Sequence, residues 1–115
     1  ERTVAELRSA GGDVEAAVLD VTDRQTVHAV FSDVVRRYGT LDLVFNNAGV
    51  GMGSEATDVT PEHWRTILDV NLHGVIHGVE AAYPVMQRQG SGHIVNTASV
   101  AGLVPMPGEV PYVTS

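Results

Sequence analysis

The sequence predicts an α/β fold built around a parallel β-sheet. Helical and strand-like patterns alternate along the chain, and each short apolar run ends in polar residues or glycine. Alternation of this kind is typical of βαβ units, in which a helix connects neighbouring parallel strands.

The chain opens with a predicted helix and a predicted strand. Apolar residues recur at helical spacing over residues 1–10, and a glycine pair at 11–12 ends the pattern where a C-cap belongs. The apolar run at 15–20 is too short for a helix and predicts a buried strand.

A second helix and a second strand follow. Thr22 and Gln25 match a capping box, with threonine as the N-cap and glutamine three residues on. Behind them an apolar stripe with i, i+3, i+4, i+7 spacing runs as far as Gly39. Residues 41–45 then predict another buried strand.

The second half predicts one long helix, a third strand and the start of a further helix. Thr60-Pro61 begins the long helix, with threonine as the cap and proline at the first helical position. It runs to about Gly90, a length of about 40 Å, so we expect a bend within it. Residues 93–97 predict the third strand, and a new helix starts near Tyr112.

Composition places the chain among globular domains. Of its 115 residues, 43% are hydrophobic and 18% are charged, which favours a folded core. The net charge of −7 argues against nucleic acid or an anionic membrane as a partner. All seven basic residues are arginine, and cysteine is absent, which excludes disulfides and thiolate chemistry. No apolar run reaches the ~18 residues of a membrane span, and we expect a cytoplasmic protein.

Polar or glycine-rich residues follow all three predicted strands. Asp20 ends the first, residues 46–49 (Asn-Asn-Ala-Gly) follow the second, and residues 97–99 (Thr-Ala-Ser) follow the third. In open parallel sheets, ligands bind outside the carboxyl ends of the strands. For any single strand, such residues can simply mark the start of a loop. Their occurrence at all three ends favours a ligand along this edge.

Asn71 interrupts the apolar stripe of the long helix, four residues after Ile67 and four before Val75. A buried amide without partners costs about 1–3 kcal/mol, so we expect its side chain to be hydrogen-bonded. A structural asparagine that bonds a neighbouring backbone or bends the helix explains this position as well as a functional one does.

Two motifs are rejected as sites. Residues 51–56 fit the pattern G-x-G-x-x-A, but that pattern requires a helix to begin at once, and the next helix begins near Pro61. His73 and His77 have metal-compatible spacing, with Glu80 one turn on. The residue after His73 is glycine rather than the glutamate of a zinc-protease motif. We predict no metal site and a surface or interface role for both histidines.

Five motifs in order resemble the classical short-chain dehydrogenase/reductase family. They are Asp20-Val21, Asn46-Asn47-Ala48-Gly49, Asn71, Ser99 thirteen residues before Tyr112, and Tyr112-Val113-Thr114-Ser115, which matches the first four positions of Y-x-x-x-K. The resemblance covers the whole chain. It implies an incomplete Rossmann-like doubly wound parallel sheet.

The family pattern extends beyond both ends of the chain. Its glycine-rich loop would precede Glu1, its lysine would be residue 116, and its substrate region would follow. We therefore expect residues 1–115 to be the central part of a single NAD(P)-binding domain. In the family's strand order, two strands that the chain lacks separate 15–20 from 41–45. We expect the isolated chain not to form the native sheet, and to be inactive.

The resemblance also implies roles for individual residues. Tyr112 would be the general acid/base and would touch the cofactor, Ser99 would bind the substrate oxygen, and Asn71 would anchor a water in a proton relay. Asp20 and Val21 would hold the adenine. The remaining cofactor contacts would lie along its adenosine side: Asn46, Asn47, Ala48 and Gly49.

The implied function is hydride transfer between NAD or NADP, which the chain does not distinguish, and a small alcohol or ketone. The family also implies a homodimer or homotetramer, with His73, His77 and Tyr83 as candidates for its contact face. The alternative is a nucleotide-binding or regulatory module that keeps the fold without catalysis.

Overall fold

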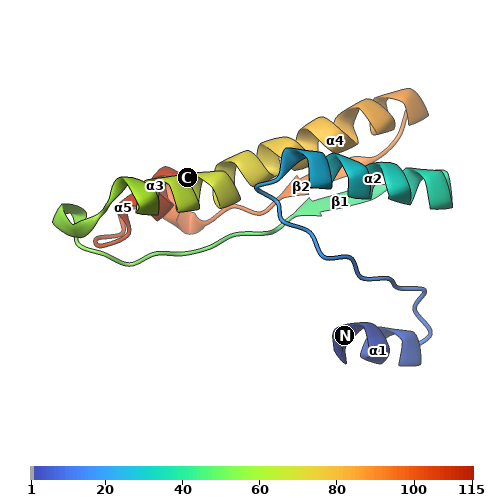
Figure 1. Cartoon of the computed structure of the whole chain (residues 1–115), viewed down its shortest axis with the longest axis horizontal. Helices are drawn as coiled ribbons and strands as arrows, with labels where there is room; N and C mark the ends of the chain where they lie inside the picture. The colour runs from blue at the N-terminus through green and yellow to red at the C-terminus, as the bar shows by residue number, and fades with distance from the viewer. Residues whose placement is uncertain (1) are drawn as a thin grey trace.

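The computed structural model describes residues 2–115, in which two parallel strands lie beneath paired helices (Figure 1). The regular elements alternate as the sequence predicts. In chain order they are α1 (Arg2–Ser9), α2 (Arg24–Tyr38), β1 (Leu43–Asn46), the 3₁₀ turn η1 (Ala56–Asp58), α3 (Pro61–Leu68), the π-helical turn η2 (Asp69–His73), α4 (Gly74–Gln89), β2 (His93–Asn96), the 3₁₀ turn η3 (Val100–Gly102) and α5 (Val110–Thr114).

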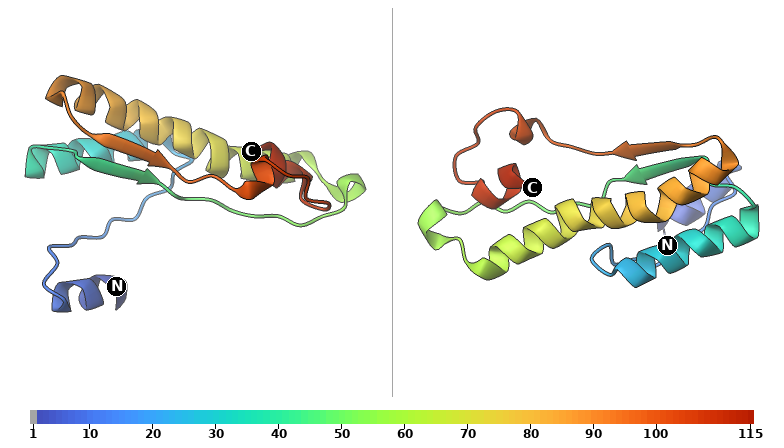
Figure 2. Two further views of the ribbon diagram at one scale, coloured as in Figure 1. Left: turned by 180° about the vertical axis from the view of Figure 1, so that it is seen from behind. Right: turned by 90° about the horizontal axis from the view of Figure 1, so that it is seen from above.

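The sheet is parallel, as expected, with β1 and β2 joined by the crossover through α3 and α4. Leu43 pairs with His93, and the register continues to Asn46 opposite Asn96. Both strands therefore end together. Their carboxyl ends open toward the part of the molecule that holds α3 and α5 (Figure 2).

Helices α2 and α4 pack against each other and cover one face of the sheet. The buried cluster beneath them consists of Leu41, Val44, Ala82 and Met86. Side chains on the opposite face of β1 remain exposed: Leu43 is 52% exposed and Phe45 is 62% exposed. The period-2 alternation of a strand explains this difference, because Val44 and Phe45 point to opposite faces.

The strand predicted at 15–20 is wrong as an element of this structure. The segment that leads from α1 to α2 pairs with no strand among residues 2–115, and Val18 is 99% exposed. A strand needs a neighbour to take up its backbone N–H and C=O groups, and α1 and this segment lie well apart from the sheet (Figure 1). The absence of a neighbour agrees with the expectation that strands outside this chain would separate 15–20 from 41–45.

The helix starts differ in detail from the prediction. Asp23, not Thr22, is the N-cap of α2, since its carboxylate accepts hydrogen bonds from the backbone N–H groups of Gln25 and Thr26. The Thr22 hydroxyl instead donates to Asp20 Oδ1 at 2.8 Å. At α3 the predicted cap is confirmed, because Thr60 accepts from the backbone of the third helical residue and Pro61 occupies the first position.

Gln89 ties the end of α4 to the start of β1. Its side-chain oxygen accepts from Leu41 N at 2.9 Å, and its amide nitrogen donates to Leu41 O at 3.0 Å. We expect Gln89→Leu to lower the free energy of unfolding by about 1–3 kcal/mol, because Leu41 is buried and both of its backbone groups would lose a partner. Urea unfolding measures the change. Gln87→Leu, at an exposed position on the same turn, is the control and should be close to neutral.

Candidate active site

A groove with a volume of about 500 Å³ lies at the carboxyl ends of β1 and β2. Segments that are far apart in the sequence form it. The lining comes from residues 47–51 after β1, residues 96–99 at the end of β2, the π turn, and α5. At these two strands, the edge for which a ligand is predicted therefore carries a groove.

Cross-strand side-chain pairs fix the two strand ends at the groove. Asn46 Nδ2 donates to Asn96 Oδ1 at 2.8 Å, and Thr97 Oγ1 donates to Asn47 Oδ1 at 2.8 Å. Successive residues of a strand point to opposite faces, so one pair lies on each face of the sheet. The polar residues that follow β1 and β2 thus hold each other before any ligand is present.

Asn71 lies in the π turn and bonds the loop that follows β1. Its Oδ1 accepts from Val50 N at 2.8 Å, while its Nδ2 donates to Val50 O at 3.0 Å and to Ser115 Oγ at 3.0 Å. The prediction that this amide is hydrogen-bonded is confirmed. The long helix is π-helical at this point, and π turns are rare and occur often at functional sites.

Ser99 and Tyr112 line the same groove from two further segments. Ser99 caps η3, and its Oγ accepts from Ala101 N at 3.1 Å, which leaves the hydroxyl hydrogen available for donation. Tyr112 is half-buried on α5. Ser115 Oγ donates to Tyr112 O at 2.8 Å and accepts from Asn71, so a short chain of hydrogen bonds connects the π turn to the helix that carries Tyr112.

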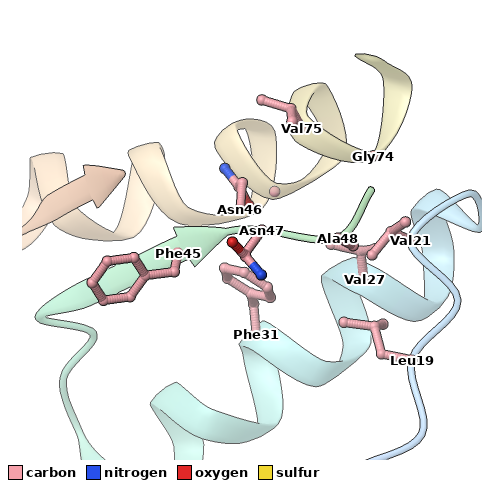
Figure 3. Close-up of a pocket in the computed structure, with 11 residues that line it drawn as sticks. Leu19, Val21, Val27, Phe31, Phe45, Asn46, Asn47, Ala48, Gly74 and Val75 are labelled. Atoms are coloured by element: carbon pink, nitrogen blue, oxygen red, sulfur yellow. The ribbon is translucent and has the colours of Figure 1, made fainter. Parts of the chain in front are cut away.

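The Asp20–Thr22 turn lies beside a second, smaller cavity of about 190 Å³. Figure 3 shows Val21 close to Ala48, with Leu19 and Val27 below them and Gly74 above. Asp20 Oδ1 accepts from Thr22 N at 2.9 Å and from the Thr22 hydroxyl. These hydrogen bonds, the side-chain bond first, hold the pKa of the Asp20 carboxyl below its ordinary value.

Asn47 and Ala48 line both cavities and so form a wall that the two share. The smaller cavity adds Val21 and Asn46, and the larger groove adds Gly49 and the three predicted catalytic residues. The structure therefore brings nearly all of the predicted site residues together along one path. Asp20 lines neither cavity, but adjoins the smaller one through Val21.

The sequence alone did not identify three residues that build this site. Asn96 is the partner of Asn46. Gly78 lies so close to β1 that a Cβ atom there would stand 2.0 Å from Asn46 Oδ1. His77 is half-buried, and its Nδ1 lies 2.9 Å from Val21 O. The sequence held one signal for His77 and Gly78: two glycines, Gly74 and Gly78, lie one turn apart on the same helix, where they permit close packing.

The other rejected motifs have plain structural explanations. Residues 51–55 form a loop, and α3 does not begin until Pro61, so the G-x-G-x-x-A match opens no helix directly. His73 is about half exposed and pairs with Asp69 within its own turn at 3.0 Å. Among residues 2–115, no group of three or more candidate ligands is arranged to hold a metal ion.

Comparison with known proteins places the chain in a family. The family model described as short chain dehydrogenase matches residues 1–115. A 3-oxoacyl-[acyl-carrier-protein] reductase, FabG, from Staphylococcus aureus is 36% identical over 115 residues, which are 100% of this chain and 47% of that protein. FabG from Thermotoga maritima is 37% identical over 112 residues, or 97% of this chain and 46% of that protein. The chain spans about half the length of the curated relatives that it matches.

Solved structures agree with the family assignment. A short-chain dehydrogenase/reductase from Burkholderia phymatum in complex with NAD superposes with a TM-score of 0.94 at 40% identity, covering 98% of this chain and 41% of that one. A gluconate 5-dehydrogenase from Burkholderia cenocepacia in complex with NADP and tartrate gives a TM-score of 0.91 at 29% identity, covering 98% and 44%. The chain belongs to the short-chain dehydrogenase/reductase family, and its sheet is an incomplete Rossmann fold.

The family consists of oxidoreductases that act on small molecules, in agreement with the activity class that the motifs imply. No helix within residues 2–115 has both the length and the hydropathy required to cross a membrane.

Proposed function

We propose that the chain is the central part of a single NAD(P)-binding domain, and that its protein transfers hydride between NAD(P)(H) and an alcohol or carbonyl substrate. The observation that carries this proposal is the convergence of Asn71, Ser99 and Tyr112 on one groove from three separate segments. Below, "the full-length protein" means the protein of the relatives' length that contains this chain.

The described residues fit a dinucleotide along the path formed by the two cavities. At the edge of the smaller cavity, Asp20 and Val21 would hold the adenine, because the Asp20 carboxylate accepts hydrogen bonds and Val21 lines the cavity beside it. Residues 46–49 would lie along the adenosine side, where Ala48 and Gly49 permit close approach of the backbone. Solved relatives in complex with NAD and with NADP support this assignment for the cofactor.

A bound nicotinamide cofactor supplies or accepts the hydride. The chain's own residues would handle the proton and orient the substrate. The Tyr112 hydroxyl would donate its proton to the carbonyl oxygen, or remove the alcohol proton in the reverse direction, and would also contact the cofactor. The Ser99 hydroxyl, whose oxygen is already held by Ala101 N, would donate a hydrogen bond to the same oxygen.

Asn71 would hold a relay water and the helix that carries Tyr112 in position. Both N–H groups of its amide are committed to Val50 O and Ser115 Oγ, and one further lone pair on Oδ1 remains for a water of the proton relay. Through Ser115, the amide holds the helix that carries Tyr112.

Asn71→Asp tests this positioning role. The new carboxylate could still accept from Val50 N but would face Val50 O with a second acceptor, so the backbone of the loop and α5 would loosen. We expect a drop of about tenfold in kcat, equivalent to the ~1.4 kcal/mol that a lost hydrogen bond can contribute, with faster amide exchange at Val113–Ser115. Asp69→Asn, a partly exposed change in the same π turn at a side chain that pairs with His73 rather than with Val50 or Ser115, should leave both quantities unchanged. Unaltered turnover and exchange in Asn71→Asp would exclude the role.

The proposed activity is tested by NAD(P)H consumption in the full-length protein with a panel of small ketones, and by NAD(P)⁺ reduction with the matching alcohols. Turnover that depends on Tyr112 supports the proposal. Cofactor binding without turnover on any member of the panel would instead favour the non-catalytic nucleotide-binding module. For the isolated 115 residues we expect no activity.

We also propose that the full-length protein forms a homodimer or homotetramer and is located in the cytoplasm. Exposed apolar side chains on α4 support an oligomer: Ile76 is 42% exposed and Tyr83 is 58% exposed. His77 is not part of that face, because it turns toward Val21. Neither a nucleic acid nor a membrane is proposed as a partner.

A further inference from the structure

His77 connects α4 to the turn where the adenine end of the cofactor is proposed to bind. Its ring nitrogen Nδ1 lies 2.9 Å from Val21 O. A carbonyl oxygen can only accept, so Nδ1 must carry the hydrogen and donate it. Among the described residues, this is the hydrogen bond that joins a side chain of α4 to the segment before α2.

The same turn is also packed tightly on the helix. A Cβ atom at Gly74 would stand 2.9 Å from Val21 Cγ2 and 3.1 Å from Val21 Cβ, so the absence of a side chain at position 74 lets Val21 approach. Figure 3 shows Val21 and Gly74 on neighbouring sides of the smaller cavity. Position 77 lies one helical turn further along, where it can reach the backbone of the same residue.

The hydrogen bonds inside the Asp20–Thr22 turn differ from the contacts that join it to α4. Within the turn, Asp20 is bonded by Thr22, and Asp23 N donates to Asp20 O at 3.2 Å. These bonds fix the shape of the turn but not its place against α4. The hydrogen bond from His77 and the contact of Val21 with Gly74 join the turn itself to α4. Just beyond the turn, Arg24 Nε donates to Glu80 Oε2 of α4 at 2.7 Å and helps to hold the start of α2.

We propose that His77 is a positioning residue for cofactor binding: its Nδ1–H donates to Val21 O and thereby holds the Asp20–Thr22 turn against α4, at the cavity that would receive the adenine. The inference rests on the proposed function, because it takes Asp20 and Val21 as cofactor contacts. It adds a residue that lines neither cavity.

Two substitutions in the full-length protein separate the hydrogen bond from the packing of the ring. His77→Phe keeps a ring but has no donor. His77→Asn places an amide N–H close to the position of Nδ1 and keeps the donor. One net hydrogen bond corresponds to a roughly 2- to 10-fold change in an equilibrium constant.

Binding of two cofactor fragments locates the effect. In His77→Phe we expect the Kd of ADP-ribose to rise roughly 2- to 10-fold, whereas the Kd of nicotinamide mononucleotide, which has no adenine, and kcat at saturating cofactor stay unchanged. In His77→Asn all of these values should stay near those of the unsubstituted protein. A general loss of structure would instead change the binding of both fragments.

Amide hydrogen exchange without cofactor provides a readout that does not depend on the proposed function. Val21–Asp23 should exchange faster in His77→Phe and at the original rate in His77→Asn. If the unsubstituted protein binds neither ADP-ribose nor NAD(P)H, the proposed function fails, while the exchange comparison still reports on the hydrogen bond.

Two results would overturn the inference: unchanged ADP-ribose binding and exchange in His77→Phe, or an equal loss in His77→Asn, which would show that the donor is not the cause. If His77→Phe does not fold, His77→Ala takes its place, since alanine is the best helix former and position 77 is only half-buried. The comparison of His77→Ala with His77→Asn then tests whether the hydrogen-bond donor is the cause.

Discussion

Tyr112→Phe is expected to lower kcat of the full-length protein by about 10²- to 10⁴-fold, the contribution typical of a positioned general acid or base. The substitution removes one hydroxyl group from a half-buried ring on α5 and leaves the ring in place. Folding should therefore change little, and the affinity for NAD(P)H should lose at most the single cofactor contact proposed for this hydroxyl. Steady-state kinetics with saturating cofactor, together with a cofactor titration, measures the two effects separately.

The control for this experiment is Tyr83→Phe. Tyr83 also loses only a hydroxyl group, but it lies on α4 and is 58% exposed, outside the groove. It should keep full turnover. Ser99→Ala provides a second comparison, because it removes the other hydroxyl that would bind the substrate oxygen. Full turnover in Tyr112→Phe would mean that another group moves the proton.

Gly78→Ala is expected to lower the free energy of unfolding by about 1–3 kcal/mol, although alanine is the better helix former by about 1 kcal/mol. A Cβ atom at position 78 would stand 2.0 Å from Asn46 Oδ1 and 2.8 Å from Asn46 Cγ. The Asn46 side chain would have to move, which breaks its hydrogen bond to Asn96. Overpacking and the lost bond together outweigh the gain in helix propensity.

A double substitution tests this explanation directly. In an Asn46→Ala background the obstructing amide is gone, so Gly78→Ala should cost much less there than in the original sequence. Gly51→Ala is the control, since no atom lies within 4 Å of a Cβ at that position. Equal costs in the two backgrounds would contradict a clash with Asn46. Urea unfolding measures the original protein, the two single variants, the double variant and the Gly51→Ala control.

Much of the fold could be predicted because it is encoded in local patterns. The apolar stripe before Gly39 and the cap at Thr60 depend on residues within one or two helical turns, and both helices form where these signals lie. Asn71 also stood out locally, as a polar residue in an apolar stripe. Its hydrogen bonds to Val50 and Ser115 follow from the fold rather than from spacing.

Two predicted elements were wrong because they depend on hydrogen-bond partners that spacing does not reveal. A strand needs a neighbouring strand, and a helix cap needs a side chain that is not already bonded elsewhere. Residues 15–20 have the composition of a strand, but strand formation requires a neighbour, and none is present among residues 2–115. At α2, two good capping residues are adjacent, and the choice falls on Asp23 because the Thr22 hydroxyl bonds Asp20 instead. Spacing alone does not distinguish these alternatives.

His77 and Gly78 were missed for a similar reason. Their partners, Val21 and Asn46, are more than thirty residues away in the sequence and become neighbours only when α4 packs beside α2 and over β1. Contacts of this kind determine how the strand ends are held in place. They are found in the structure and not in the periodicity of the helix.

The central claim is that one path at the carboxyl ends of the strands holds the cofactor and leads to Tyr112. A crystal structure of the full-length protein with NAD(P)⁺ bound tests it most directly. We expect adenine beside Asp20 and Val21, the nicotinamide end in the groove of Asn71, Ser99 and Tyr112, and the wall of Asn47 and Ala48 between them. A dinucleotide bound away from this wall, or with its nicotinamide end remote from Tyr112, would contradict it.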